Sequence, residues 1–158
     1  MAADLRPADL LEADLQETIR RLTDPAAALK TLHWGRNYLY VARLETAGGP
    51  LEVVVKQFRH RTAKDRLRRR LRGSKALKSW RVAWTLQEAG LLTPEPVMWI
   101  ESDAESGPAF YVCRYLPDLT EARYLFRAAN AGEEKERFPA VDFPAFVTAL
   151  GQTVRRLH

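Results

Sequence analysis

The chain has 158 residues, 46% of them hydrophobic and 28% charged, which is the balance of a folded protein. This composition excludes an intrinsically disordered or fibrous chain, which has too few apolar residues to form a core. No apolar run approaches the roughly 20 residues that span a bilayer, so we expect no transmembrane segment. The length corresponds to about one domain, which excludes an enzyme with two complete lobes.

The cysteine content indicates a reducing compartment. The single cysteine, Cys113, has no partner for a disulfide and lacks the spaced cysteines and histidines of a zinc site. The chain begins MAADLRPADLLEADLQ, which is acidic where a secretory signal is basic and then apolar. We therefore expect a cytoplasmic protein.

Positive charge is concentrated in one segment. The formal net charge is +5, yet residues 59–81 alone contain eleven basic residues and a single acid, Asp65. A basic block in an otherwise acidic chain predicts a face that meets an anionic partner, whether phosphate, acidic lipid or nucleic acid. The alternative is a solvated loop and helix face without a ligand.

The first predicted elements are a helix and three strands. Apolar residues at helical spacing predict an amphipathic helix over residues 9–23, which Asp24-Pro25 ends. Strand-forming residues then dominate three segments: 29–34, 38–44 and 51–58. Turn residues at 35–37 and 47–50 separate them, which predicts an antiparallel meander.

The second half predicts a helix, two strands and two more helices. Gly73-Ser74 begins and Gly90 ends a helix whose wide apolar surface suits packing between the sheet and another layer. The remaining predicted elements are strands at 97–101 and 109–116 and helices at 119–129 and 143–158, with a charged loop over 130–139. Together these segments predict an α+β fold with five strands, of which the first three form the antiparallel meander.

Lys56 is the residue that points to chemistry. It lies in an otherwise apolar strand, where Val54, Lys56 and Phe58 share one face and Val53 and Val55 share the other. A lysine on such a face needs a partner, and the phosphates of a nucleotide would supply one while Val54 packs on the adenine. The alternative is an edge-strand lysine that points into water.

The order of the predicted elements is that of a protein-kinase small lobe leading into the large lobe. The segment RGSKALKSWRVAWTLQEAGLLTPEPV resembles the helix and following loop of the bacterial lipopolysaccharide kinase (Kdo/WaaP) family. VVVKQFR, AFYVCRYL and FPAFVTALGQTVRRLH fit the same family as the lysine strand, the strand entering the hinge and the helix before the catalytic loop. The resemblance covers roughly residues 29–158.

This resemblance implies a domain plan. Residues 1–25 would be an N-terminal helical extension, 26–116 the small lobe, and 117–158 the hinge and the first helices of an incomplete large lobe. The small lobe would combine a five-stranded antiparallel sheet with one long helix. The extension would cap the sheet or dock to a partner, and its sequence does not distinguish these alternatives.

The resemblance also implies an ATP site. Lys56 would contact the α- and β-phosphates, and the loop at Gly35 would cover them. Magnesium accompanies ATP in the intact family, whose members phosphorylate inner-core sugars of lipopolysaccharide at the cytoplasmic face of the inner membrane. The residues that the resemblance assigns to ATP are Lys56, Val54, Gly35, Val41, Cys113 and Tyr115, the last two through their backbone at the adenine edge. The basic run, Arg59–Arg81, would suit the anionic lipopolysaccharide core or a membrane surface.

The sequence departs from the kinase pattern at several positions. The loop keeps a single glycine, and Ser79 occupies the place where related families carry the glutamate that holds the lysine. The chain contains neither an H-x-D nor a D-F-G motif, since Asp142-Phe143-Pro144 precedes the last helix and is better interpreted as its N-terminal cap. We therefore expect no catalytic residue, no metal ligand and no turnover by this chain alone. The last helix would then expose an apolar stripe: Phe146, Leu150, Val154 and Leu157.

Two alternatives remain open at this stage. A RIO-like protein kinase or a small-molecule phosphotransferase would share the small-lobe pattern. The acceptor site of such an enzyme would lie outside the small lobe. A noncatalytic module could instead bind nucleic acid or an acidic surface through residues 59–81. No nucleic-acid motif surrounds that run, and Trp80 and Trp84 have the spacing of core residues, so we do not expect nucleic acid as the partner.

Overall fold

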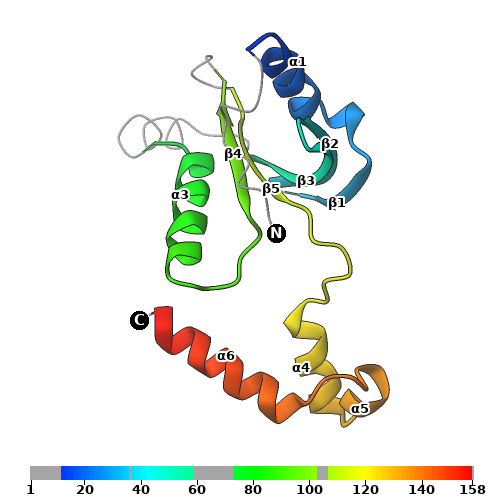
Figure 1. Ribbon diagram of the computed structural model, residues 1–158. Helices are drawn as coiled ribbons and strands as arrows, with labels where there is room; N and C mark the ends of the chain where they lie inside the picture. Colours follow the sequence, from blue (N-terminus) through cyan, green and yellow to red (C-terminus); the bar gives the residue numbers. More distant parts are fainter. Residues whose placement is uncertain (1–11, 36, 59–72, 103–106, 158) are drawn as a thin grey trace. The chain divides into compact units, whose positions relative to one another are not determined.

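The computed structural model describes residues 12–35, 37–58, 73–102 and 107–157 (Figure 1). The chain divides into two compact units, Met1–Tyr115 and Leu116–His158. The first contains a β-sheet with helices on both faces, and the second is built from helices.

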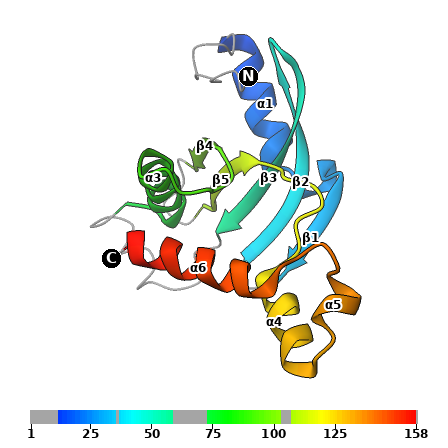
Figure 2. The same cartoon turned by 60° about the horizontal axis from the view of Figure 1, so that its bottom comes forward.

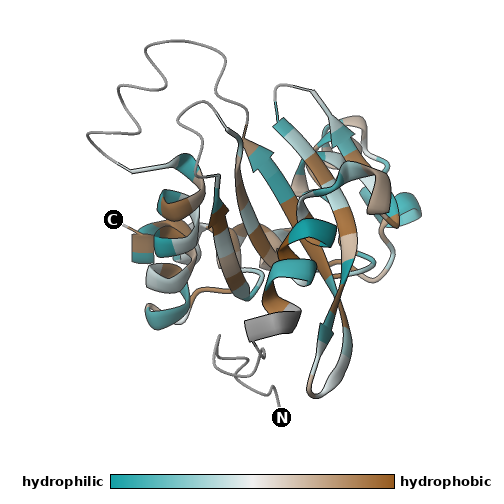
Figure 3. Ribbon diagram, turned by 90° about the horizontal axis from the view of Figure 1, so that it is seen from above, coloured by the Kyte–Doolittle hydropathy of each residue, from teal (hydrophilic) through white to brown (hydrophobic). Residues whose placement is uncertain are grey.

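The described part of the first unit forms one antiparallel sheet with the strand order β1-β2-β3-β5-β4 (Figure 1). Its strands are β1 (Lys30–Trp34), β2 (Asn37–Thr46), β3 (Gly49–Phe58), β4 (Pro96–Glu101) and β5 (Ala109–Arg114). The central strands are banded with hydrophobic residues (Figure 3), as expected where a sheet is covered on its faces. The predicted α+β fold with a five-stranded antiparallel sheet is confirmed.

The β2–β3 hairpin sets the register of the sheet. Its strands pair without interruption from Asn37 opposite Phe58 to Thr46 opposite Gly49, so the turn has two residues, Ala47 and Gly48. The Thr46 hydroxyl donates to the Gly49 carbonyl at 2.7 Å. Gly49 has φ +103°, a conformation that side-chain-bearing residues rarely adopt. This tight turn makes both strands longer than the sequence pattern predicts.

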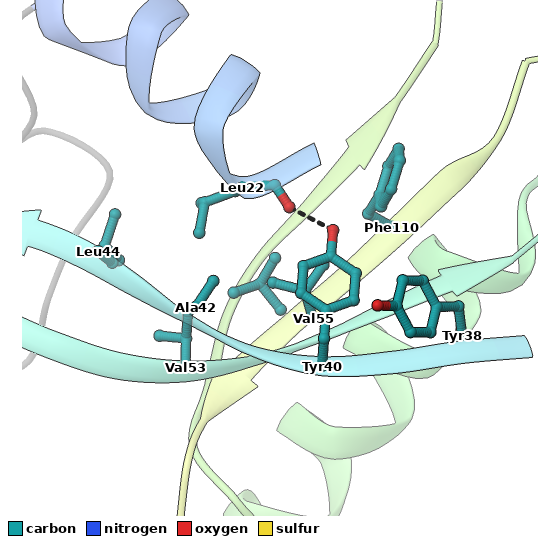
Figure 4. Close-up of a cluster of buried hydrophobic side chains, with 9 residues drawn as sticks. Leu22, Tyr38, Tyr40, Ala42, Leu44, Val53, Val55 and Phe110 are labelled. Atoms are coloured by element: carbon teal, nitrogen blue, oxygen red, sulfur yellow. Dashed lines mark hydrogen bonds between the residues drawn. The ribbon is translucent and has the colours of Figure 1, made fainter. Parts of the chain in front are cut away.

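The helix α1 (Glu12–Thr23) and the short helix η2 (Pro25–Ala27) precede the sheet. Leu22, at 1% exposure, enters the core on one face, and the Tyr40 hydroxyl donates a hydrogen bond to its carbonyl oxygen (Figure 4). The side chains buried in this core are Leu22, Tyr38, Tyr40, Ala42, Leu44, Val53, Val55, Phe110 and Val112. The helix α1 therefore covers one face of the sheet.

The helix α3 (Lys75–Glu88) covers the opposite face, against β3, β5 and β4 (Figure 2). Ser74, 2% exposed, is its N-cap and accepts a hydrogen bond from the Leu77 N–H at 3.0 Å. Ala76 packs against Phe58 and Ala109 in a second buried cluster. The predicted start of this helix at Gly73-Ser74 is confirmed.

The second unit contains α4 (Ala122–Ala131), α5 (Glu134–Arg137) and α6 (Phe143–Leu157). Rings of Phe126, Phe143 and Phe146 pack together, with centroids 5.7 to 6.5 Å apart. Asp142 accepts a hydrogen bond from the Ala145 N–H at 3.0 Å, which confirms its predicted capping role.

Two predictions for this unit need correction. The expected loop at 130–139 contains α5, because Glu, Lys and Arg are good helix formers. The exposed stripe on α6 is confirmed for Leu150, Val154 and Leu157, but Phe146 leaves it and packs on Phe126. Within the described residues, no helix is both long and apolar enough to cross a membrane.

Candidate functional site

Lys56 lies in the middle of a row of side chains that crosses three strands. Residues directly opposite in antiparallel strands share a face, and Lys56 lies opposite Leu39 of β2 and Tyr111 of β5. We call Leu39, Lys56 and Tyr111 the Lys56 row. All three side chains are half-buried, so Lys56 combines a partly desolvated stem with access to solvent.

A second row lies next to the Lys56 row on the same face. Val54 lies opposite Val41 and Cys113, and we call these three residues the Val54 row. Two residues along a strand separate the rows by about 7 Å. Val41 and Cys113 are buried and Val54 is half-buried, so this row is apolar and only Val54 keeps appreciable exposed surface. We call the surface that carries both rows the Lys56 face.

Strand alternation explains why Lys56 occupies this face. Val53 and Val55 are fully buried in the core beneath α1. Because side chains alternate along a strand, Val54 and Lys56 point to the opposite face of the sheet. A shift of one residue in register would place the Lys56 ammonium in that core. The hydrophobic pattern of β3 therefore fixes where Lys56 lies.

The described residues provide no acid for Lys56. Its Nζ lies 5.1 Å from the centroid of the Phe58 ring, a cation–π contact. No carboxylate in the described part of the chain forms an ion pair with it. Ser79, at the expected glutamate position, is half-buried on α3, and Glu88 is exposed. Among these groups the ammonium is left uncompensated, which favours an anionic ligand.

The polar groups beside Lys56 are neutral at physiological pH. Burial raises the pKa of the Cys113 thiol to about 11, although the Tyr111 hydroxyl and the Lys56 charge partly oppose this rise. Burial also raises the pKa of the Tyr111 hydroxyl, and Cys113 contributes. Both groups therefore keep their protons, so neither introduces a negative charge that would repel an anion.

The predicted glycine loop is the turn between β1 and β2. The Gly35 N–H donates to the Asn37 carbonyl at 3.1 Å, which closes the turn. Leu39 follows Asn37 by two residues, so the turn lies at the end of β2 nearer the Lys56 row than the Val54 row. A Cβ on Gly35 would come within 2.6 Å of the His33 imidazole. Arg36 lies outside the described residues.

The backbone near Tyr115 is already engaged in the sheet. The Arg114 N–H donates to the Glu95 carbonyl, and the Tyr115 N–H donates to the Glu52 carbonyl, each at 2.9 Å. The Arg114 side chain also forms a 2.9 Å ion pair with the Glu95 carboxylate. Pairing of this segment with an adenine edge stays a prediction, and it requires groups other than these two amides.

The Lys56 face combines an apolar side chain, Val54, with a cation, Lys56, about 7 Å further along β3. Among the described residues, no group of three acidic, histidine or cysteine side chains could hold a metal ion. We therefore assign no step to magnesium.

Two residues of the face were not predicted from the sequence. Leu39 and Tyr111 flank Lys56 only because of the pairing register of β2, β3 and β5. The two-residue turn at Ala47-Gly48 would have located Leu39 opposite Lys56 by counting back along the hairpin. Tyr111 had no comparable signal, because β5 reaches β3 through a long connection.

The basic run is described only in its last part. Residues 59–72 lie outside the described residues, whereas Lys75, Lys78 and Arg81 are exposed on α3. Contact of this run with an anionic lipopolysaccharide core or membrane surface stays a prediction.

Comparison with protein-family models, with curated proteins and with solved structures found no match to this chain. The resemblance to the lipopolysaccharide kinases therefore rests on the sequence segments themselves.

Proposed function

We propose that the chain binds ATP on the Lys56 face and forms the nucleotide-binding portion of a lipopolysaccharide-kinase-like phosphotransferase. The observation that carries the proposal is the position of Lys56: half-buried, beside an apolar row, and without an acidic partner among the described residues. A cation placed in this way is stabilised when an anion binds it.

The strand and helix order supports the same proposal. The β1–β2 hairpin is followed by β3, which contains Lys56, and then by α3, β4 and β5. This is the order expected of a kinase-like small lobe. The helix α3 packs on the same face as Lys56, because it contacts Phe58 and Tyr111. The helix α3 therefore bounds the Lys56 face on one side and leaves the exposed surface of Val54 for the base.

Each row has one task in the proposed complex. The base packs on Val54, the member of the row that keeps exposed surface, and burying apolar surface contributes about 25 cal/mol per Å². The Lys56 ammonium donates charge-assisted hydrogen bonds to the phosphates. The Tyr111 hydroxyl, held protonated by burial, remains a potential donor beside them.

The proposed activity of this chain alone is binding without phosphoryl transfer. Its sequence has neither the aspartate of an H-x-D motif nor that of a D-F-G motif, and both are needed for transfer in kinase-like enzymes. Phosphorylation of an inner-core sugar is the reaction that the resemblance suggests for a complete enzyme. No described residue identifies the acceptor.

Calorimetric titration with ATP tests the proposal. We expect Lys56→Met to weaken binding by about tenfold or more, because a hydrogen bond to a charged group contributes about 1.5–3 kcal/mol. Lys78→Met is the matched control, since it removes the same charge from the exposed surface of α3. Equal losses in both variants would mean that ATP is held by general positive charge, and the proposed site would be wrong.

A further inference from the structure

Three of the four tryptophans of the chain form one contiguous cluster at the outer edge of the first unit. The Trp80 ring lies 4.6 Å from Trp99 of β4 and 6.0 Å from Trp84 of α3, centroid to centroid. Trp84 is 37% and Trp99 40% exposed, although large aromatic side chains are normally well buried. We call these three residues the tryptophan cluster.

The packing of α3 on the sheet leaves the rings of Trp84 and Trp99 partly exposed. Ala76 and Ala83 supply the buried side of α3, and Trp80 is half-buried between the helix and β4. Trp84 lies one turn beyond Trp80, and β4 is an edge strand of the sheet. Two indole rings are therefore left at the surface where the helix meets the sheet edge.

The helix that carries two of the three tryptophans also has an excess of positive charge. The helix α3 contains Lys75, Lys78 and Arg81 against a single acid, Glu88. Lys78 and Arg81 are exposed, and Arg81 lies between Trp80 and Trp84 in sequence. The helix also forms the end of the basic run at residues 59–81, whose composition is eleven bases and one acid.

From this juxtaposition we infer that the tryptophan cluster and α3 dock onto an anionic phospholipid membrane surface. Indole rings prefer the interface between headgroups and acyl chains, where an apolar body and a polar N–H are both satisfied. Exposed lysine and arginine on the same helix are attracted to anionic headgroups. The inference goes beyond the proposed nucleotide site and does not depend on it.

A nucleic-acid partner fits the cluster less well. Single-stranded nucleic acids stack their bases on open aromatic faces. Here the Trp80 ring is inclined by 52° to Trp99 and by 68° to Trp84, so the rings pack against one another. They do not form a set of parallel faces for successive bases.

Vesicle binding tests the inference with the full 158-residue chain. We expect cosedimentation with vesicles that contain phosphatidylglycerol, weaker binding to pure phosphatidylcholine, and a blue shift of tryptophan emission on binding. The double variant Trp84→Ser/Trp99→Ser should bind at least about tenfold more weakly and lose most of the shift. Trp34→Ser, which removes an exposed indole from β1, is the matched control and should bind normally.

Charge reversal gives a second, independent test that leaves the tryptophan cluster intact. Lys78→Glu/Arg81→Glu should weaken binding to anionic vesicles at least about tenfold, whereas Arg43→Glu on β2 should not. Circular dichroism spectra that match the unaltered protein would show that each variant folds. The inference is overturned if the altered proteins bind as well as the unaltered one, if charge on the vesicle has no effect, or if the chain binds single-stranded RNA but no vesicle.

Discussion

The hydroxyl of Tyr40 donates a hydrogen bond to the backbone carbonyl of Leu22, joining the middle of β2 to the last turn of α1 (Figure 4). Both residues are almost fully buried, at 0% and 1% exposure. Burial raises the pKa of the Tyr40 hydroxyl, so it remains a donor at physiological pH. The N-terminal helix is therefore part of the core of the first unit.

Tyr40→Phe should destabilise the protein by about 1–3 kcal/mol, because the Leu22 carbonyl is left buried without its donor. Urea unfolding followed by circular dichroism measures the change. Tyr38→Phe is the control, since its hydroxyl bonds to the hydroxyl of Thr31, an exposed residue, and its removal should matter less. Equal effects of the two substitutions would contradict the role given to the Tyr40 bond.

Leu22→Ala should cost about 2–5 kcal/mol, the range for removing a buried leucine side chain. The loss would fall on the contact between α1 and the sheet, so amide hydrogen exchange in α1 should accelerate first. Leu29→Ala, at a position 51% exposed, provides the comparison and should change stability little. Unaltered protection of α1 in the Leu22 variant would show that the helix is held by other contacts.

Ser74→Ala should destabilise the protein by about 1 kcal/mol, because the Leu77 N–H loses its capping acceptor in a buried setting. The change should appear as a lower urea midpoint with an unchanged slope. Ser79→Ala, a half-buried serine in the middle of the same helix, is the matched control and should have a smaller effect. A midpoint unaffected by Ser74→Ala would rule out capping as the reason α3 begins there.

Stability should fall as pH rises from about 9 to about 11. The Cys113 thiol has an ordinary pKa of 9.0 and a folded-state pKa of about 11, so the folded protein binds more protons across this window. The stability contributed by the protonated Cys113 thiol is fully present below its unfolded-state pKa of 9.0. It is lost as the pH rises through the folded-state pKa of about 11. Cys113→Ser should flatten this part of the stability profile, and a slope unchanged by the substitution would contradict the assignment to Cys113.

Local patterns in the sequence predict most of the helices and strands. The alternation of side chains along β3 alone predicts the face that Lys56 occupies. The partners of Lys56 depend on pairing between strands. Leu39 could be located by counting through the β2–β3 turn, but Tyr111 arrives from β5 after α3 and β4. The exposure of Trp84 also escaped prediction, since helical spacing does not reveal that the sheet ends at β4.

We expect ATP to bind on the Lys56 face and not on the basic surface of α3. Nuclear magnetic resonance of the ¹⁵N- and methyl-labelled protein during an ATP titration tests this expectation most directly. Saturable shifts are expected at Leu39, Val41 and Val54, with smaller effects around Lys78. Shifts confined to α3, or none that saturate, would contradict it.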